Sequence, residues 1–294
     1  IALTNTALFP TNASISASNV VRMSDGAVVP WYSSFSQTEV DLNASEKKQL
    51  SFALAHPNPP EPGIYRIIIT GIDEVNDVTS ELILRLTISS FPAVELRVPG
   101  GTLAVDAFEP SSASLQLTNE GNGPQTYDLA LEAPAGWRAT LDNLGTFVDS
   151  THGSTGTLTK GAIRSIDITL KPPSVVVTAG TLMSAELTIS ARTTTDSWVV
   201  DVPLIVTASD KISLTPGSDG VDEQVRPDAR HEVPVQIVNE GNREITLTPQ
   251  IISLPGGWSS ISSTQTITID KSSSSIWDLA LEGNGRAVGG LVKV

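Results

Sequence analysis

Thr118-Asn-Glu-Gly-Asn122 is the stretch of sequence that reveals the architecture, because it returns as Val238-Asn-Glu-Gly-Asn242. A second stretch, Pro134-Ala-Gly-Trp137, returns as Pro255-Gly-Gly-Trp258. The first pair lies 120 residues apart and the second pair 121, so the two motifs recur as one block. Recurrence at a fixed period is the signature of repeated structural units. We therefore expect copies of one fold along the chain.

A third correspondence extends the repeat toward the start of the chain. Apolar residues 12 positions apart recur three times, at Leu42 and Leu54, Leu158 and Leu170, and Ile269 and Leu281. Trp31 precedes Leu42 by 11 residues, as Trp258 precedes Ile269, whereas the second copy holds ten more residues in this interval. The sequence therefore predicts three related units.

The predicted seams lie near Phe91-Pro92 and Ser209-Asp210, which gives units at 1–91, 92–209 and 210–294. Aligning Asn12 with Asn119 and Asn239 makes the first unit incomplete at its N-terminal side. The same alignment makes the third unit incomplete at its C-terminal side. Linkers of a few residues restrict bending, and a proline restricts it further. We expect an extended and fairly stiff rod.

Strand patterns dominate within each unit. Ser114–Leu117, Ile163–Leu170 and Leu182–Ile189 alternate apolar and polar residues, which is typical of strands with one wet face. Short strands separated by turn residues at such spacing indicate β-sandwiches. The predicted fold class is all-β, with tandem immunoglobulin-like sandwiches.

The repeated motifs have predicted structural roles. We expect Gly121 and Gly241 to supply the positive φ of a tight hairpin. We expect Trp31, Trp137 and Trp258 to plug the open ends of their sandwiches, because they occupy one position of the repeat.

The order of these motifs in the second copy resembles a known module. Leu117-Thr-Asn-Glu-Gly-Asn122, Ala133-Pro-Ala-Gly-Trp137 and Lys171-Pro-Pro173 are similar to the Ig-like module found next to some alpha-galactosidases. They are also similar to the CARDB cell-adhesion-related module of archaeal and bacterial surface proteins. The resemblance implies stalks, spacers and adhesive repeats, and it carries no catalytic residues.

Composition excludes several function classes. The 294 residues carry a net charge of -14, which disfavours a nucleic-acid partner. Cysteine is absent, so disulfides and thiol chemistry are excluded. No apolar run is long enough to span a membrane. The three histidines are far apart, and no nucleophile or phosphate-binding motif occurs. We expect no enzyme and no cofactor, with calcium the one ion left open.

Two kinds of binding or modification site remain open. Two acidic clusters offer oxygen ligands of the kind calcium prefers, with solvated turns as the alternative. They comprise Asp73, Glu74 and Asp77 in one loop and Asp219, Asp222 and Glu223 in the other. Asn12-Ala-Ser14 and Asn43-Ala-Ser45 are N-glycosylation sequons.

The sequence is best interpreted as a non-catalytic segment of an extracellular, cell-surface protein: a spacer, a surface-layer or filament building block, or an adhesive stalk. Its expected partners are other copies of itself or neighbouring surface proteins, with glycans as a further option. The alternative is a carbohydrate-binding accessory module of a secreted glycoside hydrolase. One filament hypothesis has Ile1–Phe9 adding as a strand to the third unit of another copy.

Overall fold

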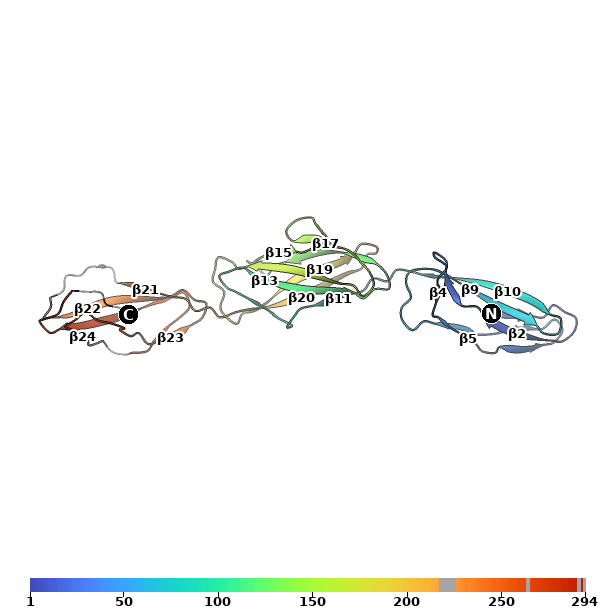
Figure 1. Ribbon diagram of the computed structural model, residues 1–294, viewed down its shortest axis with the longest axis horizontal. Helices are drawn as coiled ribbons and strands as arrows, with labels where there is room; N and C mark the ends of the chain where they lie inside the picture. Colours follow the sequence, from blue (N-terminus) through green and yellow to red (C-terminus); the bar gives the residue numbers. More distant parts are fainter. Residues whose placement is uncertain (217–225, 263–264, 290–291, 293–294) are drawn as a thin grey trace.

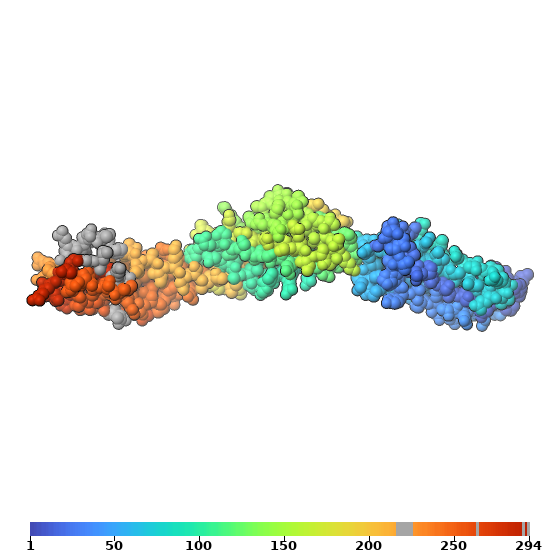
Figure 2. All heavy atoms as spheres, in the orientation of Figure 1, coloured from blue at the N-terminus to red at the C-terminus, as the bar shows by residue number. Residues whose placement is uncertain are grey.

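The computed structural model describes residues 1–216, 226–262, 265–289 and 292. The regular secondary structure of these described residues consists of β-strands alone. Figure 1 shows three separate β-sandwiches in a row, which we call unit 1, unit 2 and unit 3 in chain order. Figure 2 shows the resulting elongated body, with unit 1 in blue and unit 3 in orange and red. The predicted all-β fold and extended arrangement are confirmed. Asp219, Asp222 and Glu223 lie outside the described residues.

Unit 2 is a sandwich of a four-stranded and a six-stranded sheet. One sheet has the order β11-β13-β18-β15 and the other the order β12-β20-β19-β14-β17-β16. Their bounds are β11 Val94–Arg97, β12 Leu103–Val105, β13 Ser111–Asn119, β14 Gln125–Glu132, β15 Arg138–Asp142, β16 Thr146–Phe147, β17 His152–Leu158, β18 Ile163–Lys171, β19 Leu182–Ala191 and β20 Ser197–Val206.

Alternation along these strands builds the core of unit 2. Leu115 and Leu117 of β13 and Ile166 and Ile168 of β18 are buried, while their neighbours face solvent. Burying one such side chain stabilises the fold by about 1.5–3 kcal/mol. The continuous core explains why the strand pattern could be found in the sequence alone.

Unit 3 repeats the smaller sheet in the order β21-β22-β26-β24, beside a two-stranded sheet of β23 and β25. Their bounds are β21 Ile212–Pro216, β22 Arg230–Asn239, β23 Ile245–Leu247, β24 Trp258–Ser260, β25 Ile267–Ile269 and β26 Ser274–Gly283. Within the described residues of this unit, no strands correspond to β19 and β20.

Unit 1 has the larger sheet in the order β4-β3-β9-β2-β6, with β10 also paired to β9. In place of the smaller sheet, unit 1 has two separate two-stranded sheets, β1-β7 and β5-β8. The bounds are β1 Ala2–Thr4, β2 Thr11–Ala17, β3 Val20–Arg22, β4 Val28–Val29, β5 Tyr32–Phe35, β6 Glu39–Leu42, β7 Lys47–Gln49, β8 Phe52–Ala55, β9 Gly63–Asp73 and β10 Val78–Ile88.

Strand register corrects the alignment of unit 1. Thr11 pairs with Leu42 as Gln125 pairs with Leu158 in unit 2. Six residues before Thr11 and before Gln125 lie Asn5 and Asn119. The counterpart of Asn119 and Asn239 is therefore Asn5, and the alignment with Asn12 is wrong. The sequence shift arose because unit 1 keeps the asparagine and loses the rest of the Glu-Gly-Asn motif.

The start of the chain pairs within its own unit. Ala2–Thr4 is antiparallel to Lys47–Gln49, and the Leu50 N–H donates to the Ile1 carbonyl at 2.8 Å. Asn5 is anchored to the carbonyl of Asn43 at 2.9 Å. The hypothesis that Ile1–Phe9 is donated to another copy is wrong in that form, because part of this segment is already a strand of unit 1.

Candidate functional site at the unit junctions

A buried asparagine organises the end at which the chain enters each unit, which we call the leading end. Asn119 donates to the carbonyls of Gly123 and Leu158, both at 2.9 Å, and accepts the Gly121 N–H at 3.0 Å. Asn239 and Asn5 make the same kinds of bond within units 3 and 1. These are bonds to the carbonyl four residues on, to the carbonyl of the apolar residue Ile269 or Leu42, and from the N–H two residues on. This amide satisfies backbone groups that a tight buried loop would leave unpaired.

The asparagine that ends the motif binds the linker from the preceding unit. The Phe91 N–H donates to the Asn122 side-chain oxygen at 2.7 Å, and the Asn122 amide donates to the Ser89 carbonyl at 3.0 Å. The Asn122 N–H donates to the Phe91 carbonyl at 3.1 Å. Asn122 thus pairs with the linker backbone as a neighbouring strand would, and we call this contact the asparagine clasp.

The second junction repeats the clasp. The Ser209 N–H donates to the Asn242 side-chain oxygen at 2.8 Å, and the Asn242 amide donates to the Thr207 carbonyl at 2.7 Å. The Asn242 N–H donates to the Ser209 carbonyl at 3.1 Å. Both junctions therefore hold the linker by the same three bonds.

The glycines of the motif serve close approach and not the φ that the sequence indicated. Gly121 and Gly241 are absent from the residues with positive φ, so that expectation is wrong. A Cβ on Gly121 would lie 2.7 Å from the Phe91 carbonyl oxygen, and one on Gly241 would lie 2.6 Å from that of Ser209. Positive φ falls instead on Gly136 and Gly257, in the Pro-x-Gly-Trp turns.

A lysine gives each junction a second attachment. The Lys160 ammonium, in the turn between β17 and β18, donates to the Pro59 carbonyl of unit 1 at 3.0 Å. Lys271 occupies the same turn of unit 3 and donates to the Thr178 hydroxyl of unit 2. Two attachments at separate points restrict rotation of one unit against the next more than a single linker does.

The neighbouring contacts differ between the junctions. At the first, Pro62 packs so closely on Gly123 that a Cβ there would lie 2.6 Å from the proline ring. At the second, Arg243 donates to the Asp210 carboxylate at 2.7 and 2.5 Å, and this bond lowers the pKa of Asp210. The pair is exposed, so its contribution to stability is small.

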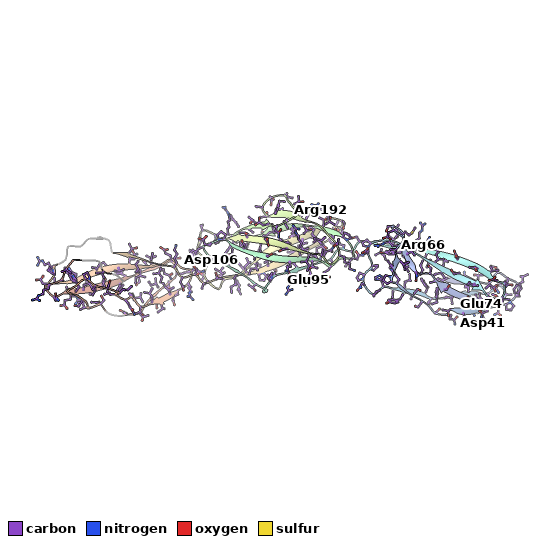
Figure 3. All side chains as sticks on the ribbon, viewed as in Figure 1. Asp41, Arg66, Glu74, Glu95, Asp106 and Arg192 are labelled. Atoms are coloured by element: carbon purple, nitrogen blue, oxygen red, sulfur yellow. The ribbon has the colours of Figure 1, made fainter. Side chains whose placement is uncertain are left out.

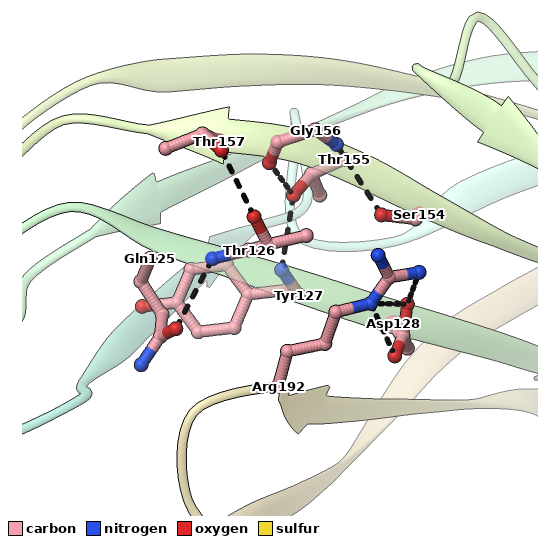
Figure 4. A network of polar contacts seen from close by, with 9 residues as sticks. All are labelled: Gln125, Thr126, Tyr127, Asp128, Ser154, Thr155, Gly156, Thr157 and Arg192. Carbon is pink, nitrogen blue, oxygen red and sulfur yellow. Dashed lines mark hydrogen bonds and ion pairs between the residues drawn. The ribbon is translucent and has the colours of Figure 1, made fainter.

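Tyr127 connects the first junction to the core of unit 2. Its ring is fully buried, and its hydroxyl lies 2.8 Å from the Ala93 carbonyl and 2.9 Å from the Asn119 side-chain oxygen. Burial raises the pKa of Tyr127 to about 12. Figure 4 shows the polar contacts around it, including the Tyr127 N–H to the Thr155 hydroxyl and the exposed pair of Asp128 and Arg192.

The three repeated tryptophans are placed as follows. Trp137 is 7% exposed and belongs to the core of unit 2. Trp31 and Trp258 are half-buried, and the Trp258 indole N–H donates to the Val288 carbonyl at 3.0 Å. Trp31 packs on Tyr65 and His56, 5.7 and 5.4 Å between ring centroids. The side chains that could stack on a sugar are thus partly or fully taken up by packing.

One of the three described calcium candidates already takes part in local hydrogen bonds. The Asp73 carboxylate accepts bonds from the Thr11 hydroxyl, the Asn76 amide and two backbone N–H groups of its own turn. The bonds from Thr11 and Asn76 lower its pKa. Glu74 and Asp77 lie in the same exposed turn. In the described parts of the chain, no three His, Cys, Asp or Glu side chains are grouped to hold a metal ion.

Both sequons lie at the leading end of unit 1, where Figure 3 labels Asp41 and Glu74. The Asn43 side chain is exposed in a turn and donates to the Glu46 carboxylate at 3.0 Å. The half-buried Asn12 donates to Asp41 across the β2–β6 pair at 2.7 Å. Among the described residues no helix is long and apolar enough to cross a membrane.

Sequence reasoning quoted Asn122 and Asn242 but missed their role, and it missed Lys160 and Lys271 entirely. A usable signal was present, because each lysine follows two residues after the apolar residue Leu158 or Ile269. The role itself could not be found, because the partners belong to the linker or to another unit.

No family model and no curated protein matches the chain. Among solved structures, the YadV chaperone is similar at 10% identity, with a TM-score of 0.28 over 68% of this chain and 88% of that chain. The E. coli chaperone DraB is similar at 10% identity, with a TM-score of 0.26 over 63% and 84%. A Porphyromonas gingivalis protein of unknown function is similar at 14% identity, with a TM-score of 0.24 over 69% and 99%. Likenesses this weak carry no argument about function, and the resemblance to the galactosidase-associated and CARDB modules stays a prediction.

Proposed function

We propose that the chain is a non-catalytic structural segment of an extracellular, cell-surface protein, in which tandem sandwiches hold two ends at a set separation. The observation that carries this proposal is the repetition of one junction. The same asparagine clasp and a contact from the equivalent lysine join unit 1 to unit 2 and unit 2 to unit 3. When the same joint is repeated, each unit is held in a similar orientation relative to the unit before it. Such an arrangement suits a spacer, a filament segment or an adhesive stalk.

The clasp explains why such a rod would resist bending. Linker backbone groups that water would otherwise bind are paired with Asn122 or Asn242, and each bond contributes about 0.5–1.5 kcal/mol net. Opening a junction breaks several of these bonds together. The lysine contact adds a second point away from the linker, so bending and twisting are both restricted.

The surface chemistry supports an exposed location. A net charge of -14 favours a solvated surface that attracts cations. Partners of the proposed segment are other copies of the chain or neighbouring surface proteins. No catalytic residue or cofactor enters this proposal.

Solution scattering and surface labelling test the proposal separately. Small-angle scattering of the intact chain should give the maximum dimension of a straight row of three units. Antibodies raised against the chain should label intact cells of the source organism. A collapsed particle, or labelling only after cell lysis, would contradict the structural or the surface part of the proposal.

The carbohydrate-binding alternative is tested with a glycan array. Half-burial of Trp31 and Trp258 and burial of Trp137 leave little ring surface for stacking on sugars. We therefore expect no specific glycan. Saturable binding that is lost in Trp31→Ala or Trp258→Ala would favour the alternative.

A further inference from the structure

The leading end of unit 1 differs from those of units 2 and 3 at each position that contacts a preceding unit. Strand register and the shared asparagine bonds define the equivalent positions. Where the clasped ends have glycine, asparagine and lysine, unit 1 has Ala7, Leu8 and Ala44. The equivalent residues are Gly121, Asn122 and Lys160 in unit 2, and Gly241, Asn242 and Lys271 in unit 3.

Each difference removes one feature of the joint. Ala7 places a Cβ where, in unit 2, it would lie 2.7 Å from the linker carbonyl. Leu8 can neither accept nor donate the side-chain bonds of the clasp, and it is 90% exposed. Ala44 has no group to donate to a neighbouring loop.

The rest of the loop is retained. Asn5 is buried and keeps its bonds to the Phe9 carbonyl and from the Ala7 N–H, both at 2.9 Å. Pro10 matches Pro124, five residues after the asparagine in both units. General divergence of the loop would not spare the residues that act within the unit while changing all three that act between units at both junctions.

We propose that the glycine, asparagine and lysine form the surface by which a leading end accepts the trailing end of a like unit, and that unit 1 does not accept a like unit in this way. The accepted partner is an extended linker that offers a carbonyl and, two residues on, an N–H and a carbonyl, as Ser89 and Phe91 do. A nearby loop of that partner supplies an oxygen for the lysine. The proposal rests on the junction contacts and does not depend on the surface location.

The first experiment replaces the three junction residues of unit 2 with the equivalent residues of unit 1, in the full chain. The chain has no cysteine, so spin labels can be placed at Ser34→Cys in unit 1 and Gln116→Cys in unit 2. We expect Gly121→Ala/Asn122→Leu/Lys160→Ala to broaden the label-to-label distance distribution roughly twofold, as a free linker would. Glu120→Ala/Thr159→Ala is the matched control, because the side chains of these exposed neighbours form no hydrogen bond or ion pair across the junction, and it should leave the distribution narrow.

Folding is monitored by hydrogen exchange in both units. If the triple variant loses protection in unit 2, Asn122→Leu/Lys160→Ala replaces it, since both side chains act outside the core. A distribution as narrow as that of the unchanged chain in a folded variant would overturn the proposal.

The second experiment asks whether the same residues create the joint. Register places Ile1 level with Leu115, because Thr4 pairs with Lys47 as Thr118 pairs with Ile163. A second copy of residues 1–114 fused directly before Ile1 of the full chain therefore presents a unit 1 trailing end to a unit 1 leading end. We expect a broad distance distribution across this new junction, and a narrow one after Ala7→Gly/Leu8→Asn/Ala44→Lys. A narrow distribution without the substitutions, or a broad one with them, would overturn the proposal.

Discussion

The leading ends of units 1 and 2 share a scaffold and differ in what fills it. In unit 2, Tyr127, Ile189 and Trp198 occupy three neighbouring strands, with Ile189 opposite Trp198 in the register. The same register positions in unit 1 hold Ala13, Gly71 and Ser80. Unit 1 accordingly has a hollow of about 410 Å³, lined by these three residues together with Leu3, Asn5 and others.

The comparison separates two functions of the loop that follows Asn5 in unit 1 and Asn119 in unit 2. Asn5 and Asn119 satisfy the same backbone groups in both units, so this function belongs to the fold of each sandwich. Asn122 reaches the linker before unit 2, so this residue belongs to the joint, whereas Tyr127 packs in the core of unit 2 and reaches the Ala93 carbonyl where that unit starts.

The largest expected effect is that of Tyr127→Ala. The substitution would remove the buried ring and leave in unit 2 a hollow like that of unit 1. We expect a loss of about 3–5 kcal/mol in the free energy of unfolding of unit 2. Denaturant unfolding followed by hydrogen exchange of unit 2 amides measures it. Tyr32→Ala, at a 68% exposed position in unit 1, is the control and should change little. A loss below about 1 kcal/mol would show that the ring is not a core element.

The buried asparagine gives the next effect. Asn119→Ala would leave the Gly123 and Leu158 carbonyls without their donor and the Gly121 N–H without its acceptor. Orphaned buried groups of this kind cost about 1–3 kcal/mol each, so we expect a loss of about 2–4 kcal/mol in unit 2 after relaxation. Asn5→Ala should cost a similar amount in unit 1, measured the same way. A large effect in one unit alone would contradict the shared role.

The features that could be predicted from the sequence are those that depend on residues close together in the chain. Alternation in Ile163–Leu170 predicted a strand that exists as β18, because burial on one face is a local pattern. The pairs of apolar residues 12 apart found equivalent core positions, and Leu42, Leu158 and Ile269 are all buried. The rod was predicted from the short linkers.

The rest depends on contacts that no local pattern records. Gly121 is glycine because a carbonyl of the linker passes 2.7 Å from where its Cβ would be, which no turn rule reports. The shift from Asn5 to Asn12 was avoidable, since the Asn5–Pro10 spacing repeats that of Asn119–Pro124. The loss of Gly and Asn from unit 1 hid that match.

Alkaline pH offers a smaller effect, to which the buried Tyr127 of unit 2 contributes. The folded pKa of Tyr127 is raised to about 12 from an unfolded value of about 10. The neutral hydroxyl is favoured in the fold, so its stabilising effect is complete below about pH 10 and is lost as pH rises toward about 12. We expect unit 2 to lose about 2 kcal/mol across that window, whereas Tyr127→Phe should lose less. Equal losses in both proteins would assign the pH dependence to other groups.

The smallest expected effect concerns the ten extra residues of unit 2. They make the interval from Trp137 to Leu158 longer than the equivalent interval from Trp31 to Leu42 in unit 1. Asp149 accepts bonds from the Thr151 and His152 N–H groups at 2.7 and 2.8 Å, and its carboxylate lies 2.9 Å from the His152 ring nitrogen. The bond from the Thr151 N–H, followed by the contact with the His152 ring, lowers the pKa of Asp149 to about 2. The carboxylate is half-exposed, so the turn is ordered locally and the sandwich does not depend on it. The folded pKa is depressed, so the turn should keep its order above about pH 4 and lose it as pH falls toward 2. NMR shifts of the Thr151 and His152 amides should titrate in that range and should stay displaced at all pH values in Asp149→Asn, while the unfolding midpoint of unit 2 hardly moves. A large change in that midpoint would mean that the added turn supports the sandwich, and the comparison with unit 1, which folds without it, would have to be redrawn.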